Sequence, residues 1–188
     1  EDGAQLWAES FDRDLSATDL FSLEDELSQL VIAKVGDGYG IIPQALANVS
    51  RDKPAKELAT HEAMLRFMAY INQFRVEDFL AAKAALEAAV EREPSHGPSW
   101  AALSILCAED YLRGLTPERG PSERAWKLAN HAIALTPLSA IAHLARTMAA
   151  YVSHRPEIVM TEAERTIELN PNDVAFVGFV GFLIGFSG

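Results

Sequence analysis

The chain has 188 residues, with 27 acidic and 16 basic side chains and a formal net charge of −11 at pH 7. Apolar residues make up 49% of it, which excludes an intrinsically disordered chain, and the length allows one domain or one domain and a fragment. An acidic surface repels phosphate groups, so this composition disfavours nucleic-acid binding and binding to anionic membrane surfaces by this segment.

The acidic residues are concentrated at the start of the chain. Residues 1–40 hold ten acids against Arg13 and Lys34, a net charge of −8. Three glycines fall within residues 36–40, which is typical of a turn or linker. We therefore expect two units, 1–40 and 41–188.

The first unit contains two short patterns. The stretch 4–11, with Trp7 and Phe11, follows a turn-forming Asp-Gly pair and predicts a short strand. Leucines at helical spacing behind Ser22 predict an amphipathic helix over about 22–35.

Internal repetition dominates the second unit. Three Ala-rich helical stretches are each closed by a proline, at Pro94, Pro137 and Pro171, with spacings of 43 and 34 residues. A period of 34 is the length of a unit of two antiparallel helices. The extra nine residues of the first spacing fit within 113–122, where two glycines and two prolines cannot continue a helix. We expect a loop there, between paired helices.

The residue pattern agrees with this period. After Pro94 a bulky, an apolar and a small residue recur at helical spacing, and small residues recur in the second helices, where they allow two helix backbones to approach closely. On this pattern the chain resembles tetratricopeptide repeats. The resemblance implies an all-α superhelix of about three helix pairs plus one extra helix, packed through Pro94, Trp100, Leu103, Ser104, Ala125, Ala132, Pro137, Pro171 and Gly181.

The unit after Pro137 departs from the repeat count, which would place Arg146 at a buried position. Burying an unpaired arginine costs several kcal/mol, roughly 3–5 when a buried charge loses its partner. We therefore expect the apolar stripe, offset by two residues, to be the buried face: Ile141, Leu144, Ala145, Met148 and Val152.

A narrower resemblance covers the whole chain. The segments 6–13, 19–27 and 168–173 resemble bacterial signalling proteins in which a TolB-like domain precedes tetratricopeptide repeats. The resemblance implies that 1–40 is the C-terminal fragment of a TolB-like domain. It also implies that an output domain, either a class III adenylate cyclase or a winged-helix DNA-binding domain, lies upstream in a longer parent protein.

The last predicted helix, 174–186, would lack the second helix of its pair, so we expect the chain to be cut within the last repeat. Its apolar face, which includes Val180 and Ile184, then predicts self-association. Its 13 apolar residues are fewer than the roughly 20 of a membrane span. The spacing of Gly178, Gly181 and Gly185 favours close helix packing over a nucleotide loop.

The sequence offers no catalytic constellation. The five histidines are scattered without metal-ligand spacing, and the single cysteine, Cys107, lies at a helix packing position, which favours a buried structural thiol. Cys107 alone also excludes an internal disulfide. We expect no metal, no cofactor and no enzymatic activity in this segment.

The remaining function is recognition of a protein or peptide. In stacked helix pairs the first helices line an inner wall where extended peptides bind. We expect Arg146 either to pair with Glu109, or to hold a ligand carboxylate, or to be a solvated or salt-bridged surface residue. The candidate wall residues are Leu65, Asn72, Ala101, Ile105, Glu109, Ala142, Arg146 and Phe182.

The leading hypothesis is thus a non-catalytic regulatory module of a bacterial signalling protein, cytoplasmic, or periplasmic if the parent has an upstream membrane span. The alternative is the non-catalytic portion of an adenylate cyclase or of a winged-helix transcriptional regulator. A third interpretation is structural, in which residues 1–40 fold back and block the inner wall.

Overall fold

A computed structural model describes residues 53–171, 178, 180–181 and 184–185. These residues are all-helical, with six named α-helices, one 3-10 turn and no strand among them. The all-α prediction is confirmed for this part of the chain. The predicted strand at 4–11, helix at 22–35 and boundary at 36–40 lie outside the described residues.

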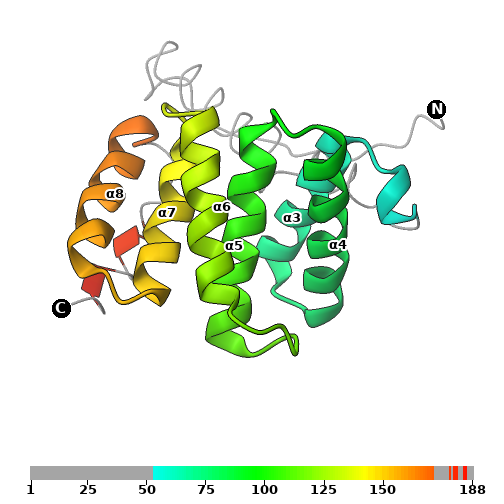
Figure 1. Cartoon of the computed structure of the whole chain (residues 1–188), viewed down its shortest axis with the longest axis horizontal. Helices are drawn as coiled ribbons and strands as arrows, with labels where there is room; N and C mark the ends of the chain where they lie inside the picture. Colours follow the sequence, from blue (N-terminus) through cyan, green and yellow to red (C-terminus); the bar gives the residue numbers. More distant parts are fainter. Residues whose placement is uncertain (1–52, 172–177, 179, 182–183, 186–188) are drawn as a thin grey trace, which may run out of the picture.

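The helices follow one another with short connections (Figure 1). The 3-10 turn η2 precedes the first of them, and the bounds are η2 Ala55–Glu57, α3 Thr60–Gln73, α4 Val76–Arg92, α5 Gly97–Arg113, α6 Pro121–Leu135, α7 Ala140–Val152 and α8 Pro156–Leu169.

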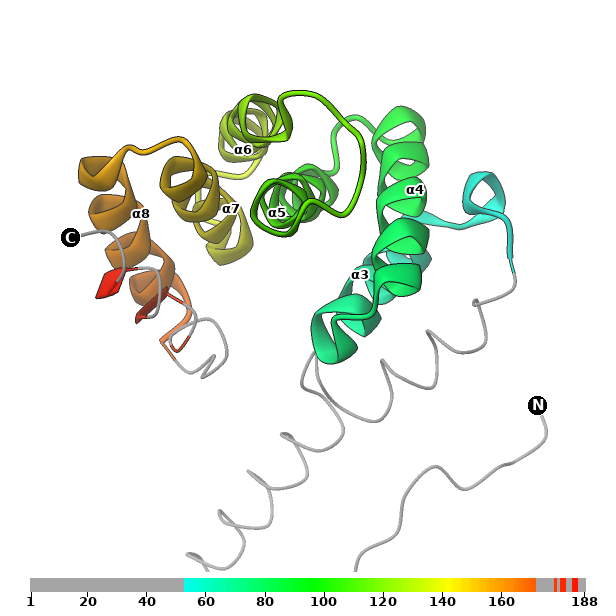
Figure 2. The same cartoon turned by 90° about the horizontal axis from the view of Figure 1, so that it is seen from below.

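Consecutive helices form three pairs. Helix α3 packs against α4, α5 against α6, and α7 against α8. The first helix of each later pair also contacts both helices of the preceding pair: α5 contacts α3 and α4, and α7 contacts α5 and α6. Figure 2 shows the result as a curved row that runs from α3 and α4 at one end to α8 at the other.

The predicted helix ends are found close to where the prolines placed them. The second helices α4, α6 and α8 end at Arg92, Leu135 and Leu169, each two residues before a proline. The predicted loop at 113–122 is also confirmed, because α5 ends at Arg113 and α6 begins at Pro121. Its Gly114 and Gly120 have φ angles of 61° and 69°, which only glycine adopts without strain.

Small side chains bring the helices together. Ala82, Ala89, Ala125 and Ala132 are all fully buried. The hydroxyl of the buried Ser104 donates to the backbone carbonyl of Ala125 at 2.8 Å, which joins α5 to α6 directly. Close approach of the backbones explains why these positions are small.

Larger side chains fill the remaining core. Leu103 is 1% exposed, and other large side chains at most 2% exposed include Tyr70, Phe79, Leu86, Leu106 and Met148. Trp100 is partly buried against this core, and its indole N–H donates to the carbonyl of Pro94 at 2.8 Å. The tryptophan thereby ties the start of α5 to the turn that follows α4.

Helix α7 confirms the offset stripe and extends it. Leu144, Ala145, Met148 and Val152 are buried and Ile141 packs partly buried against the core. His143, Thr147 and Ala150 from the repeat-count register are buried as well, whereas Arg146 from that register is partly exposed. Contacts with α5, α6 and α8 surround α7 on several sides, which explains why nearly the whole helix is covered.

The C-terminal prediction needs correction. Val180 was expected on a face left without a partner, but it is fully buried in the chain's own core, and Ile184 packs partly buried against the same core. The argument for self-association therefore loses these two residues. Gly181 is exposed, and a Cβ there would meet no other described atom within 4 Å, so no close helix contact forms at it.

None of the helices in the described part of the chain is both long enough and apolar enough to cross a membrane.

Candidate functional site

A buried ionic network joins α4, α5 and the loop between α5 and α6. The ammonium of Lys83 lies 2.9 Å from the Asp110 carboxylate and 2.5 Å from that of Glu118. The Lys83 side chain is 10% exposed and that of Asp110 only 1%. Asp110 also accepts hydrogen bonds from the backbone N–H and the hydroxyl of Thr116, at 2.8 and 2.5 Å. The network therefore holds the loop against the end of α5.

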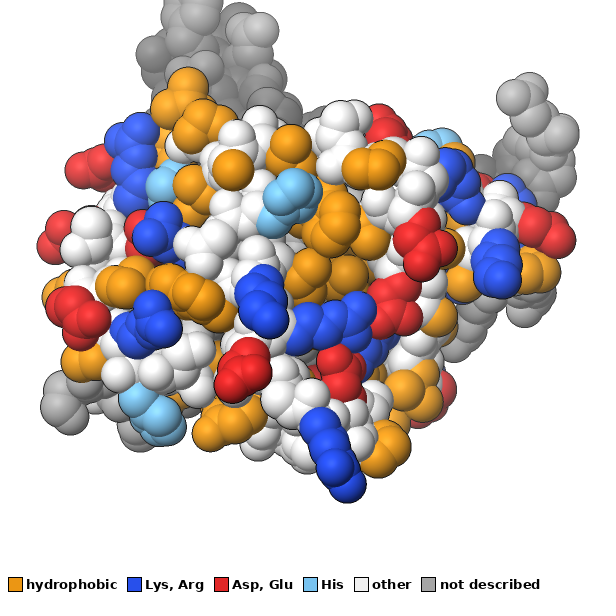
Figure 3. All heavy atoms as spheres, in the orientation of Figure 1, with side chains coloured by type: hydrophobic (Ala, Val, Ile, Leu, Met, Phe, Trp, Pro, Cys, Tyr) orange, Lys and Arg blue, Asp and Glu red, His pale blue; other side chains and the backbone are white. Residues whose placement is uncertain are grey.

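Arg124 extends this network to the surface. Its guanidinium donates to Glu118 at 3.1 Å and to Glu87 of α4 at 2.7 Å. Figure 3 shows basic and acidic side chains adjoining over α4, α5 and α6 on this face. Each charge has at least one opposite partner, and the two cations and three carboxylates give the cluster a formal net charge of −1.

Ionisation in the network follows from its pairing. Burial disfavours the charged forms, but the hydrogen bonds to Glu118 and Asp110 outweigh it and raise the pKa of Lys83. The same bonds, with those from Thr116 and Arg124, outweigh burial and lower the pKa of Asp110 and of Glu118. All three groups are therefore held in their charged forms.

Glu109 behaves differently, although it is the neighbour of Asp110. Burial raises the pKa of Glu109, against the opposing hydrogen bond from the Tyr70 hydroxyl at 3.2 Å and the charge of Arg113 at 3.8 Å. Arg113 also donates to the Tyr70 hydroxyl at 2.9 Å, so α3 and α5 are joined here.

These opposite shifts predict a stability maximum in mild acid. The folded state binds the Glu109 proton more tightly than the unfolded state, so stability rises as pH falls from the raised pKa toward the ordinary value of 4.5. The lowered pKa values of Asp110 and Glu118 act in the opposite sense, and their contribution is lost below about pH 4. Urea unfolding across pH 3–7 measures the free energy of unfolding on both sides of the maximum. In Glu109→Gln we expect this free energy no longer to rise as the pH falls from neutral, but still to decrease below about pH 4. If it rises in Glu109→Gln as it does in the unsubstituted chain, the assignment to Glu109 is wrong.

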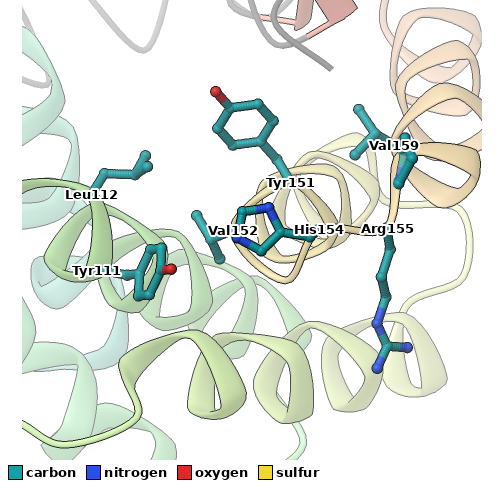
Figure 4. A pocket seen from close by; sticks show the side chains of 8 residues that line it. Tyr111, Leu112, Tyr151, Val152, His154, Arg155 and Val159 are labelled. Carbon is teal, nitrogen blue, oxygen red and sulfur yellow. The ribbon is translucent and has the colours of Figure 1, made fainter. Parts of the chain in front are cut away.

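A cavity of about 430 Å³ opens where the ends of α5 and α7 meet the start of α8. Figure 4 shows its lining: Tyr111, Leu112, Tyr151, Val152, His154, Arg155, Pro156 and Val159. Val152 and Val159 are almost fully buried and form an apolar floor, whereas Tyr111 and Leu112 are 45% and 47% exposed. His154 has a φ angle of 55°, a strained conformation that occurs often at functional sites.

The cavity has the size and lining of a candidate binding site. Its volume lies within the range of ligand sites, roughly 300–1,000 Å³. Aromatic and apolar side chains dominate the described lining, and the Tyr111, Tyr151 and His154 rings add polar groups. No group of three or more His, Cys, Asp or Glu side chains among the described residues could hold a metal ion.

Four of the seven predicted wall residues that the structure describes are buried and do not form an open surface. Ala101 and Ala142 are fully buried, Ile105 is 3% exposed and Glu109 is 9% exposed. The prediction assigned one face of α5 to the core and the opposite face to a ligand, but α5 contacts α3, α4, α6 and α7. A helix surrounded by four others has little side-chain surface left. Leu65 and Asn72 on α3 are partly exposed, and Phe182 lies outside the described residues.

Arg146 is partly exposed but does not pair with Glu109. Its guanidinium lies 3.5 Å from Glu162 of α8, and Glu162 also contacts the His143 ring nitrogen Nδ1 at 2.6 Å. The pairing with Glu109 is thus wrong because that carboxylate is engaged by Tyr70 and Arg113 instead.

Cys107 is fully buried, as expected for a structural thiol. Burial raises its pKa to about 11, which keeps the thiol protonated and unreactive at neutral pH.

Sequence reasoning missed the cavity residues Tyr111, Leu112, Tyr151 and His154. A signal was present, since Tyr111 and Leu112 directly precede the predicted loop and the 154–156 stretch follows an apolar helix. Only the contact between the second and third helix pairs brings these two chain segments together.

A scan of the sequence against protein-family models finds no match, and a search of curated proteins also finds none.

Proposed function

We propose that this segment is a protein-interaction module that binds an extended peptide of a partner protein, with tetratricopeptide-type helix pairs as its scaffold. The observation that carries the proposal is the cavity at the ends of the first helices α5 and α7, with an apolar floor and exposed aromatic and aliphatic rim residues. Exposed large apolar side chains beside a concavity, here Tyr111 and Leu112, favour an interaction site.

The order of contacts supports the same proposal. The first helices α5 and α7 each contact their own partner and both helices of the preceding pair, which is the arrangement expected of stacked helix pairs. Arrays of this kind form concave surfaces that bind extended ligands. A peptide would insert a bulky apolar side chain over Val152 and Val159, while its backbone reaches the hydroxyls of Tyr111 and Tyr151.

The resemblance to bacterial TolB-like and tetratricopeptide signalling proteins extends this proposal to a regulatory role. Binding here would then control an output domain elsewhere in the parent protein, an adenylate cyclase or a winged-helix regulator. The segments that carry this resemblance lie mostly within residues 1–40, outside the described part of the chain.

Selection from a random peptide library tests the binding proposal. We expect the enriched peptides to share a bulky apolar residue and to bind Leu112→Glu at least about tenfold more weakly, which corresponds to roughly 1.4 kcal/mol. Leu138→Glu is the matched control, because Leu138 is 73% exposed and lies outside the cavity lining. Equal binding to the two variants, or no enrichment at all, would reject this site.

A further inference from the structure

Two arginines share one tryptophan at the junction of α6, α7 and α8. The guanidinium carbon of Arg155 lies 4.2 Å from the centroid of the Trp126 ring, and that of Arg146 lies 5.6 Å from it. Trp126 comes from α6, Arg146 from α7 and Arg155 from the residue that precedes α8. Three separate elements therefore converge on this site, which we call the Trp126 site.

Neither guanidinium makes a hydrogen bond to a described residue. Arg155 has no acidic partner within the described part of the chain, and its recorded contact there is the indole ring. The nearest acid to Arg146 is Glu162 at 3.5 Å, beyond a good hydrogen bond. The Nε atom of Arg146 is buried and has no hydrogen-bond partner. An arginine carries five N–H donors, so both side chains hold unused capacity.

The local charge is also unbalanced. Glu162 is the acid at the Trp126 site, and its two oxygens are divided between His143 at 2.6 Å and Arg146. Arg155 lies at the N-terminus of α8, where the helix dipole adds positive potential, and its guanidinium forms no ion pair with a described residue, although Glu157 lies in the first turn of the same helix. This occurs in a chain with a net charge of −11.

We infer that the Trp126 site binds a carboxylate of an acidic peptide segment on a partner protein. Stacking on an indole face leaves the in-plane N–H groups of a guanidinium free, and that fork matches a carboxylate bidentately. The local charge favours a carboxylate, because two guanidinium groups and one carboxylate, that of Glu162, meet at the site although the net charge of the whole chain is −11.

The Trp126 site is distinct from the proposed peptide cavity. Arg155 is one of the residues that line that cavity, but Figure 4 shows its side chain directed away from Tyr151 and His154. The inference therefore stands without the proposed function, and variants at Leu112 and at Arg155 test the two separately.

Titration with acetyl-tetraglutamate amide, followed by NMR of the arginine Nε–H and indole N–H signals, tests the inference. We expect saturable shifts of the Arg146, Arg155 and Trp126 signals, and binding at least about tenfold weaker in Arg155→Ala and in Arg146→Ala. Arg155→Lys keeps the charge and loses the fork, so we expect it to bind more weakly than the unsubstituted chain.

Arg165→Ala is the matched control, because this substitution removes the same charge from α8. Arg165 pairs with Glu168 at 2.9 Å, and both side chains are exposed. It should change the affinity less than twofold, and the neutral acetyl-tetraglutamine amide should cause no shift. Thermal unfolding confirms that each variant is folded. Three outcomes would each overturn the inference. The first is an equal loss of affinity in Arg165→Ala and Arg155→Ala, and the second is signal shifts with the glutamine peptide. The third is signal shifts with inorganic phosphate but not with the glutamate peptide.

Discussion

Replacing Lys83 by alanine is expected to destabilise the protein by about 3–5 kcal/mol. The substitution leaves Asp110, whose side chain is 1% exposed, without the ammonium that balances it, and takes one partner from Glu118. Removing one member of a buried ion pair is costly because the remaining charge stays desolvated. Chemical unfolding measures the loss directly, and the melting temperature should fall by roughly 6–20 °C.

Two further variants show whether the charge itself is responsible. Lys83→Met combined with Asp110→Asn removes both charges at similar volume and should recover at least half of the loss. Arg165→Ala breaks an exposed pair and should cost less than about 1 kcal/mol. If Lys83→Ala and Arg165→Ala lower the free energy of unfolding equally, the buried network stabilises the protein no more than an exposed ion pair does.

The same substitution has a local consequence. Asp110 accepts the backbone N–H of Thr116 and directly precedes Tyr111 and Leu112, which line the cavity. In Lys83→Ala we therefore expect faster hydrogen exchange at the Thr116 amide, because the loop loses its attachment to α4. Unchanged exchange there would mean that the loop is held by other contacts.

Replacing Gly97 by alanine is expected to cost about 1–3 kcal/mol. A Cβ at this position would lie 2.5 Å from Thr136 Oγ1, 2.6 Å from Cγ2 and 3.1 Å from Cβ. Rotating the threonine side chain cannot clear all three atoms, and its hydroxyl also donates to the carbonyl of Ala132 at 2.9 Å. The start of α5 must therefore move away from the end of α6. Urea unfolding measures this cost.

Matched variants separate this contact from a general effect of glycine substitution. Thr136→Ala in the Gly97→Ala background removes two of the three clashing atoms and should recover most of the stability. Gly181→Ala should be neutral or slightly stabilising, since a Cβ there meets no described atom within 4 Å and alanine favours a helix. A greater loss in Gly181→Ala than in Gly97→Ala would contradict the packing described here.

Local chemistry in the sequence predicted the helical framework. Proline cannot continue a helix and glycine adopts left-handed φ angles, so Pro94, Pro137 and the 113–122 stretch marked the ends of helices before any contact was known. Small residues such as Ala125 and Ala132 marked close helix contacts for a similar reason. The tetratricopeptide and signalling assignments remain predictions.

The candidate site was harder to predict, because exposure depends on neighbours that are distant in sequence. Ala101, Ile105 and Ala142 were placed on an open wall by assuming that each first helix has one covered face. Whether a position on α5 or α7 is open depends on how many helices surround it, and periodicity along one helix contains no such information.

The sequence by itself determined the proline-marked ends of α4, α6 and α8, the loop between α5 and α6, and the small residues at helix contacts, since these follow from backbone preferences and short-range spacing. The tertiary structure alone decided which charges meet. Lys83 joins Asp110 and Glu118 from 27 and 35 residues away, and Arg146 and Arg155 meet on Trp126. Such pairings depend on the angle and offset between packed helices. Side-chain volumes at the contact set that angle and offset, so no local sequence pattern predicts them.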